Sequence, residues 1–276
     1  MRKLRRSARL VDMTQHLLAH PHTLIPLTYF SEEYGSAKSS ISEDLSIIKE
    51  AFESQGIGDL RTVAGAAGGV KYIPRTTHEH AAAFMETLIM ELAKPERLLP
   101  GGYLYMSDIL GDPKTLNHIG KLLASAFRQS DVDVVMTVEA KGIPLAYATA
   151  SFLNVPVVVV RRNNMVTEGS VVSINYVSGS SKRIQTMSLA RRALPEESRV
   201  LIVDDFMKAG GTIQGMMDLL QEFKATVVGC GVFVETADDA DRLIEDYISL
   251  AKLQEVDVKE KQIMIELGSY FSNKEE

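Results

Sequence analysis

The sequence contains little cysteine, little proline and no long apolar run. A single cysteine among 276 residues, Cys230, cannot form an internal disulfide, which indicates a reducing compartment. The 9 prolines and 19 glycines are too few for collagen-like or proline-rich repeats. No stretch reaches the roughly 18 uncharged apolar residues of a membrane helix. Residues 1–6 are basic but lack the apolar run of a secretory signal. We therefore expect a cytoplasmic protein without a membrane partner.

Signatures of common enzymes and metal sites are also missing. No Gly-x-Ser-x-Gly elbow, Walker loop or His-Glu-x-x-His motif occurs. His78 and His80 are two residues apart without a third ligand, so solvated histidines in a linker are the simpler interpretation. The sequence therefore predicts no metal site. With 45% hydrophobic and 24% charged residues, the composition is that of a globular protein.

Charge is spread unevenly along the chain. Residues 1–75 contain ten basic and eight acidic residues, whereas the whole chain has a net charge of −6, so the remainder carries −8. The first eleven residues hold five positive charges and no acid. This asymmetry indicates a basic contact module on an acidic body, with a solvated basic tail as the alternative.

Residues 1–74 are predicted to form three helices and a hairpin. The first helix rests on the spacing of Leu10, Val11, Leu17 and Leu18, and Pro21 ends it. A second helix is predicted over residues 27–34, with Gly35 after it. Strands over residues 60–63 and 70–73 flank a glycine-rich loop and form the hairpin.

The third helix has the clearest pattern. Apolar residues at positions 41, 45, 48 and 52 form one buried stripe. Its start is ambiguous, because Ser36 is one candidate cap and Ser40 with Glu43 forms a candidate capping box. In a helix-turn-helix, the N-terminal part of the second helix enters the DNA major groove, and residues 36–45 carry the small and basic side chains that such contacts require.

A hairpin after such helices would be a wing. Many winged helices bind proteins instead, but the basic N-terminus favours DNA. The candidate DNA-contacting residues are Arg2, Lys3, Arg5, Arg6, Lys38, Ser39, Ser40, Ser42, Arg61, Gly68, Gly69 and Lys71.

The remaining residues, 75–276, are predicted to form a second domain. Strands are predicted over residues 133–138, 155–160, 171–176, 200–203 and 226–234, and helices over residues 78–93, 114–129, 143–153 and 212–223. Four of the strands are near-continuous runs of valine and isoleucine, which is typical of strands buried on both faces. This alternation predicts an α/β fold with a doubly wound parallel sheet, whose ligands bind at the carboxyl ends of the strands.

The most informative segment is residues 200–212. An apolar strand leads into Asp204 and Asp205, then a loop with two glycines, then a helix that opens at Thr212. Backbone N–H groups and the positive end of a helix dipole suit a phosphate group. The two carboxylates can accept hydrogen bonds from sugar hydroxyls. An ordinary turn with two solvated acids is the alternative.

This segment resembles the signature of type I phosphoribosyltransferases, which bind phosphoribosyl pyrophosphate (PRPP). The resemblance implies that the paired acids hold the ribose hydroxyls and that the loop binds the 5′-phosphate. Lys208 stands where that family commonly has a small residue, and Ala209 where it often has a hydroxyl. Both departures leave phosphate binding by backbone amides possible, but they put turnover in doubt.

Other segments are similar to further parts of the same family. Residues 138–144 look like its pyrophosphate loop, with Gly142 permitting a tight turn and Lys141 facing the diphosphate. Arg161 and Arg162 follow a strand, and the loop after residue 176 stands where the related enzymes have a mobile loop that closes over PRPP. That loop contains Ser178, Gly179, Ser180, Ser181, Lys182 and Arg183. The candidate effector-binding residues are Tyr103, which could stack on a nucleobase, and Glu139, Ala140, Lys141, Gly142, Asp204, Asp205, Phe206, Met207, Lys208, Ala209, Gly210, Gly211 and Thr212.

Together, a winged helix and a phosphoribosyltransferase-like domain resemble the purine operon repressor (PurR) family of Gram-positive bacteria. The stretches LIPLTYFSEEYGSAKSSISEDL, AAGGVKYIP, NYVSGSSKRIQTMSLA and VDDFMKAGGT carry the resemblance. It implies a homodimeric repressor of purine synthesis and transport genes that binds double-stranded operator DNA. It further implies that PRPP, with or without Mg²⁺, relieves repression and that a purine nucleotide such as ppGpp competes for the site. No resident cofactor is expected.

Two other functions fit the same residues. One is an active purine phosphoribosyltransferase whose N-terminal module binds a protein. The other is a nucleotide-sensing adaptor that does not contact DNA. The departures at Lys208 and Ala209 and the N-terminal helices favour a repressor over an enzyme.

Overall fold

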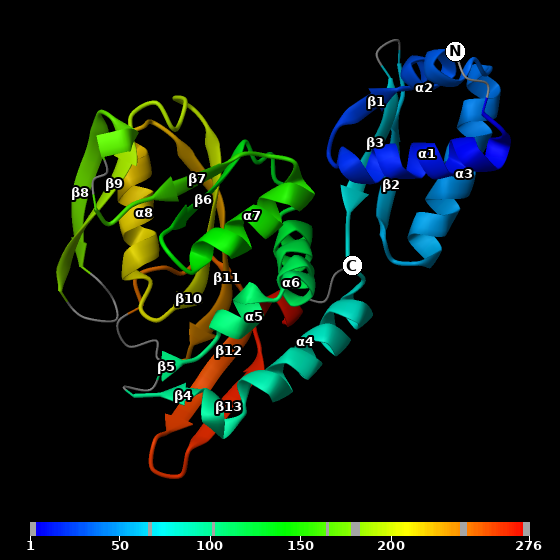
Figure 1. The fold of residues 1–276 in the computed structure, drawn as a ribbon. Coiled ribbons are helices and arrows are strands. Elements are labelled where there is room, and N and C mark those ends of the chain that lie inside the picture. The colour runs from blue at the N-terminus through cyan, green and yellow to red at the C-terminus, as the bar shows by residue number, and fades with distance from the viewer. Residues whose placement is uncertain are drawn as a thin grey trace. The chain divides into compact units, whose positions relative to one another are not determined.

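The chain folds into two compact units, which Figure 1 shows as a ribbon. The structure is a computed structural model that describes residues 4–65, 68–100, 103–163, 166–177, 183–237 and 242–272. The first unit comprises residues 1–77 with 152–154, and the second comprises residues 78–151 with 155–276. The predicted boundary at residue 74 stays a prediction. Among the described residues, no helix is long and apolar enough to cross a membrane.

The described part of the first unit contains three helices and a small antiparallel sheet. Its elements are α1 (Arg6–Ala19), β1 (Leu24–Pro26), α2 (Leu27–Tyr34), α3 (Lys38–Ser54), β2 (Gly58–Val63) and β3 (Gly69–Pro74). The strand order is β1-β3-β2, so the predicted hairpin gains a third strand that the sequence analysis missed. β1 is only three residues long, too short to show an alternating pattern.

The helix predictions for this unit are largely confirmed. α2 has the predicted bounds, and Gly35 after it takes the left-handed conformation that favours glycine. The predicted stripe of α3 is buried in the unit's core. For α1 the predicted face was partly wrong, because Val11 and Leu18 are exposed and Met13 is buried beside Leu17.

Both caps predicted for α3 are wrong. The helix begins at Lys38 after Ala37, and no side chain caps it. Ser36 serves another purpose, because its hydroxyl accepts a hydrogen bond from Arg9 Nη1 at 3.0 Å. Ser40 lies within the first turn, too far along the helix for the capping position.

A buried carboxylate joins α1 to α3. Asp44 on α3 is fully buried and accepts hydrogen bonds from Arg6 Nε at 2.9 Å and from Arg9 Nε at 2.6 Å. The helix pattern gave no warning of this pair, because Asp44 lies on the apolar side of α3, between Ile41 and Ile48. A buried carboxylate is tolerated where its charge is paired in this way.

The second unit contains a large sheet with helices on both faces. Its described residues form the helices α4 (His78–Leu92), α5 (Ser107–Gly111), α6 (Pro113–Ala126), α7 (Gly142–Leu153) and α8 (Gly211–Gln221), and the 3₁₀ turns Pro95–Arg97, Val166–Glu168 and Ser269–Phe271. Its strands are β4 (Leu98–Leu99), β5 (Tyr103–Leu104), β6 (Val134–Val138), β7 (Val157–Val160), β8 (Val171–Val177), β9 (Ile184–Ala190), β10 (Arg199–Met207), β11 (Thr226–Thr236), β12 (Ile248–Asp257) and β13 (Gln262–Leu267). Figure 1 shows α8 beside the β8–β9 pair on one side of the sheet, with α6 and α7 on the other.

The sheet confirms the predicted α/β architecture and adds to it. Its strand order is β13-β12-β11-β10-β6-β7. All neighbours are parallel except β13, which is antiparallel to β12. Strands β12 and β13 were not predicted, because charged residues interrupt their apolar runs. The predicted strand over residues 171–176 exists as β8, but it pairs only with β9 in a separate sheet.

The strand that carries the paired acids is longer than predicted. β10 continues through Asp204 and Asp205 to Met207, because it keeps pairing with β11 as far as Glu235. The acids therefore belong to a strand, and the connecting loop shrinks to residues 208–210. Helix α8 begins at Gly211, one residue before the predicted start.

Candidate functional site

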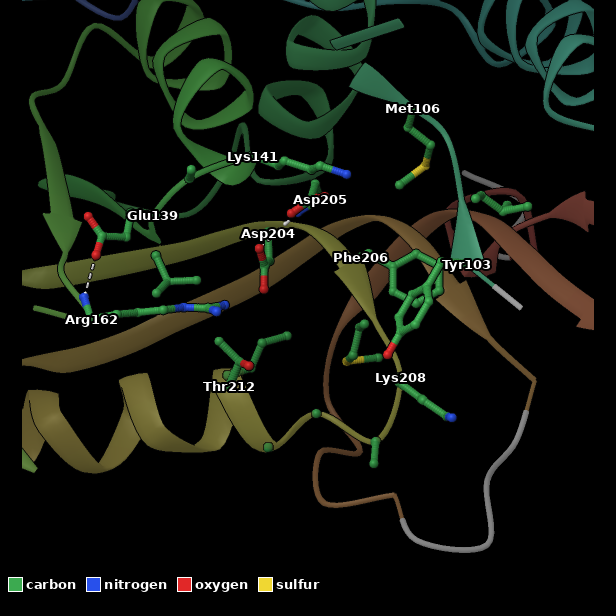
Figure 2. A pocket seen from close by; sticks show the side chains of 18 of the residues that line it. Tyr103, Met106, Glu139, Lys141, Arg162, Asp204, Asp205, Phe206, Lys208 and Thr212 are labelled. Atoms are coloured by element: carbon green, nitrogen blue, oxygen red, sulfur yellow. Dashed lines mark hydrogen bonds between the residues drawn. The ribbon is translucent and has the colours of Figure 1, made fainter. Parts of the chain in front are cut away.

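A cavity of about 540 Å³ opens at the carboxyl ends of β6 and β10, the edge at which ligands of doubly wound sheets bind. Figure 2 shows side chains pointing into it from several elements. Its lining comprises Leu99, Pro100, Tyr103, Leu104, Met106, Val138, Glu139, Ala140, Lys141, Arg162, Asp204, Asp205, Phe206, Met207, Lys208, Ala209, Gly210, Gly211, Thr212 and Ile213. Every predicted effector-binding residue except Gly142 is in this set, so the structure brings together segments more than a hundred residues apart.

The loop between β10 and α8 has the local geometry of an anion site. Gly210 precedes the helix with φ of 83°, a left-handed conformation that other residues rarely adopt. The following N–H groups begin α8, so the positive end of its dipole faces the cavity lining. Leu243 N donates to Ala209 O at 2.9 Å and supports the loop from outside.

Replacing Gly210 tests whether this geometry matters. A Cβ there would lie 2.8 Å from Ile244 Cγ1, and the positive φ would also be strained. We expect Gly210→Ala to lower the free energy of unfolding by about 1–2 kcal/mol, measured by urea denaturation. Gly111→Ala is the control, because a Cβ there meets nothing within 4 Å. Equal stabilities of both variants would contradict the strained role of Gly210.

The paired acids lie beside this loop in a low-polarity setting. Asp204 is 5% exposed and Asp205 is half-buried. Burial, followed by the charge of Asp205, raises the pKa of Asp204 well above its ordinary value. Burial likewise raises the pKa of Asp205. Asp205 N donates to Asp204 Oδ1 at 3.0 Å, which leaves carboxylate oxygens available for ligand hydroxyls.

Positive side chains line the same cavity as the acids. Lys141, Arg162 and Lys208 are exposed and line it. Figure 2 shows Arg162 beneath Asp204, whereas the Lys208 side chain is directed away from the acids. Glu139 orients this region, because its Oε1 accepts from Arg162 N at 2.6 Å. Arg161 is paired with Glu139 at 3.3 Å and does not line the cavity. Of the two arginines noted in the sequence, Arg162 is therefore the one at the site.

Gly142 has a packing role beneath the cavity. A Cβ at this position would lie 2.2 Å from Thr137 Oγ1 and 3.2 Å from Asp204 Oδ1. Only glycine allows α7 to begin this close to β6 and to the buried acid. Gly142 therefore shapes the site from below.

An apolar wall of the cavity was not predicted from the sequence. Leu99, Pro100, Leu104 and Met106 stand around Tyr103 on and beside the β4–β5 pair. These strands are two residues long, so no periodicity could reveal them. Within the predicted loop, residues 178–182 lie outside the described part of the chain, and Arg183 is exposed.

The candidate DNA contacts fall into two groups on the first unit. Lys38, Ser39 and Ser42 are exposed and Ser40 is half-buried, all in the N-terminal half of α3. Arg61 and Lys71 face each other across the β2–β3 pair. Their charges add to burial in lowering the pKa of nearby His22 to about 4, so this hairpin carries concentrated positive charge.

The other DNA candidates are placed differently. Arg5 is exposed, Arg6 is paired with Asp44, and residues 2 and 3 lie outside the described ranges. Packing explains why Gly68 and Gly69 are glycines, because a Cβ at either position would lie within 2.4 Å of a backbone oxygen. Among the described residues no group of three metal-ligating side chains occurs.

Comparisons with known proteins agree with this architecture. The family model for the bacterial purine repressor N-terminal domain matches residues 5–74, and that for the phosphoribosyl transferase domain matches residues 106–267. Adenine phosphoribosyltransferase from Thermoanaerobacter pseudethanolicus superposes with a TM-score of 0.54 at 24% identity, covering 61% of this chain and 99% of that one. This likeness shows the fold of the second unit.

Relatives that span both units identify the family. The purine biosynthesis transcriptional repressor PurR of Bacillus subtilis is 63% identical over 97% of this chain and 94% of that protein. The purine biosynthesis transcriptional activator PurR of Lactococcus lactis is 45% identical over 98% of this chain and 100% of that protein. These full-length relatives are named as transcriptional regulators, which confirms the prediction of a regulator rather than an enzyme. The chain belongs to the PurR family of purine biosynthesis transcriptional regulators.

Proposed function

We propose that this protein represses purine biosynthesis and transport genes by binding double-stranded operator DNA, and that PRPP bound in its second unit relieves repression. The observation that carries the proposal is the cavity itself. There Asp204 and Asp205 lie beside a loop that leads into the N-terminus of α8, a geometry that suits a phosphate group. The 63% identical relative, named a repressor, favours repression over the activation named for the 45% identical relative.

The cavity suits each part of PRPP. Asp204 and Asp205 accept hydrogen bonds from the ribose hydroxyls, and amides of residues 208–212 receive the 5′-phosphate. Lys141 and Arg162 face the diphosphate. No resident cofactor is needed. Carboxylate and phosphate oxygens are the donors Mg²⁺ prefers, so Asp204 and Asp205 are the residues that would hold a Mg²⁺ accompanying the diphosphate.

Calorimetric titration tests the ligand assignment. Purified protein with Mg²⁺ should bind PRPP in one saturable site per chain. Titration of ppGpp into protein saturated with PRPP should show an apparent affinity that falls in proportion to the PRPP concentration, as competition requires. Absence of PRPP binding would contradict the proposed effector, and additive binding of both ligands would contradict a shared site.

Relief of repression requires different PRPP affinities in the DNA-bound and free states. The exposed N-terminal half of α3 and the basic β2–β3 hairpin form the proposed DNA contacts. We further propose that two chains assemble, since a two-fold symmetric dimer reads a palindromic operator. Sedimentation with and without operator DNA tests the assembly.

We expect an electrostatic contribution to induction. PRPP would place several negative charges among Lys141, Arg162 and Lys208, and we propose that these cations attract DNA phosphates when PRPP is absent. Operator affinity should fall less steeply with salt when PRPP is bound, with the log–log slope smaller by about 1–3, one for each DNA phosphate that these cations no longer neutralise. Fluorescence anisotropy across a salt series measures this. An unchanged slope would remove the electrostatic part and leave a purely conformational effect.

A further inference from the structure

One buried arginine lies behind the apolar wall of the cavity. Arg97 is 6% exposed, and all five of its N–H donors are used. Nε and Nη2 donate to Glu91 O at 2.8 Å and Glu91 Oε1 at 2.7 Å. Nη1 and Nη2 grip both oxygens of Asp108 at 2.8 and 2.9 Å, and Nη1 also donates to Tyr105 O at 2.9 Å. The planar fork of arginine is required for such a set.

These bonds fix the β4–β5 pair to two helices. Glu91 lies on α4 and Asp108 on α5, whereas Arg97 directly precedes β4. The backbone closes the same unit, because Tyr105 N donates to Arg97 O at 2.8 Å. One side chain therefore sets where the β4–β5 pair stands relative to the body of the second unit.

The β4–β5 pair forms one side of the cavity. Leu99 pairs with Tyr103 across the two strands, and both line the cavity. Leu104 and Met106 are buried and line the same cavity. Figure 2 shows Tyr103 and Met106 directed into the cavity from the segment that faces β10. Arg97 itself does not line the cavity, so it acts on a ligand only through this wall.

The cavity thus has two chemically different halves. The acids, the loop and the cations suit ribose and phosphates, which PRPP and a purine nucleotide share. The apolar wall suits a flat base, and only the nucleotide has one. Stacking of a base on an aromatic ring depends on offset and distance, so a displaced Tyr103 weakens nucleotide binding and leaves PRPP binding almost unchanged.

We infer that Arg97 is a positioning residue that sets the preference of the site between a purine nucleotide and PRPP, by holding the Tyr103-bearing wall in place. This inference rests on the proposed function, since it requires both ligands to use the cavity.

Arg97→Lys tests the inference, because lysine keeps the charge and loses the fork. Calorimetry with GMP and ppGpp should show about a tenfold loss of nucleotide affinity, within the range of one stacked base. PRPP affinity should stay within twofold. Asp108→Asn keeps Arg97 and its Glu91 bonds, and should shift the nucleotide affinity in the same direction by about threefold. Arg199→Lys is the control. Arg199, at the start of β10, donates from Nε and Nη2 to the two carboxylate oxygens of Asp133, and lysine cannot form this paired contact.

A double-mutant cycle separates positioning from general structural support. In a Tyr103→Ala background, Arg97→Lys should no longer change nucleotide affinity, because the group it positions is gone. Equal losses for nucleotide and PRPP, or an undiminished effect without Tyr103, would overturn the inference. A wild-type protein that binds PRPP but no purine nucleotide would also overturn it and leave the PRPP proposal intact. Failure of the wild type to bind PRPP would instead overturn the proposed function.

Discussion

Asp204→Asn is expected to lower PRPP affinity about a hundredfold while operator affinity stays within about twofold. Charge-assisted hydrogen bonds contribute about 1.5–3 kcal/mol each, and about 1.4 kcal/mol corresponds to a tenfold change in affinity. Asp204 is 5% exposed and lines the cavity, so we expect its bonds to the ribose hydroxyls to contribute in this range. Calorimetry with PRPP and anisotropy with operator DNA measure the two affinities.

The same variant should be more stable than the wild type. The folded pKa of Asp204 is raised by burial above its ordinary value of 3.8, so the folded state holds its proton more tightly than the unfolded state. The stability of the wild type therefore falls as the pH rises from about 3.8 through the raised pKa. Asparagine does not titrate, so the advantage of the variant in thermal unfolding should grow over that window.

Asp218→Asn is the control for PRPP binding. Asp218 lies on α8 but does not line the cavity, is exposed, and bonds only to Gln214 among the hydrogen bonds described. It should leave PRPP affinity unchanged. If Asp204→Asn bound PRPP as the wild type does, the acid pair would not hold the sugar. If it instead lost operator binding and kept its PRPP response, sensing and DNA binding would be assigned to the wrong residues.

Asp44→Ala is expected to destabilise the first unit by about 3–5 kcal/mol, the cost of breaking a buried ion pair from one side. The substitution leaves the Arg9 side chain, 11% exposed, without its carboxylate partner. Operator affinity should be lost at temperatures where the second unit still binds PRPP, because Asp44 belongs to the first unit alone. Scanning calorimetry should show the unfolding transition of the first unit at a lower temperature than in the wild type.

Glu43→Ala provides the comparison within the same helix. Glu43 is exposed and lies 3.7 Å from Arg6 Nη2, and such surface pairs contribute about 0–1 kcal/mol. The variant should bind operator DNA nearly as the wild type does. If the unfolding temperature of the first unit were the same in Asp44→Ala as in the wild type, the role assigned to the buried ion pair would be contradicted.

Helices and strands with a regular local pattern of apolar residues could be predicted from the sequence. The stripe on α3 and the valine-rich strands β6 and β11 follow from repeats of about 3.6 and from long apolar runs. The acid pair and the glycine-containing loop before α8 were also predictable, since adjacent acids and two glycines after a buried strand are a local sequence pattern. The expected ligand, PRPP, came from the resemblance to known families.

Features that depend on tertiary contacts could not be predicted. Asp44 has a place on the apolar side of α3 only because two arginines of α1 reach it. Ser36 is no cap because α3 begins at Lys38, with Ala37 in the cap position, and its hydroxyl instead accepts from Arg9 of α1. The apolar wall around Tyr103 rests on Arg97, whose partners lie on two helices. The partners of Asp44 and Ser36 are distant in sequence. The partners of Arg97 are nearer but belong to separate helices, so no spacing within one helix or strand encodes any of these contacts.

The most direct measurement is the electron density of crystals soaked with PRPP and Mg²⁺. The account predicts ribose hydroxyls at Asp204 and Asp205 and the 5′-phosphate at the amides of residues 208–212. A cavity left empty at saturating PRPP, or the sugar phosphate bound elsewhere on the chain, would contradict it.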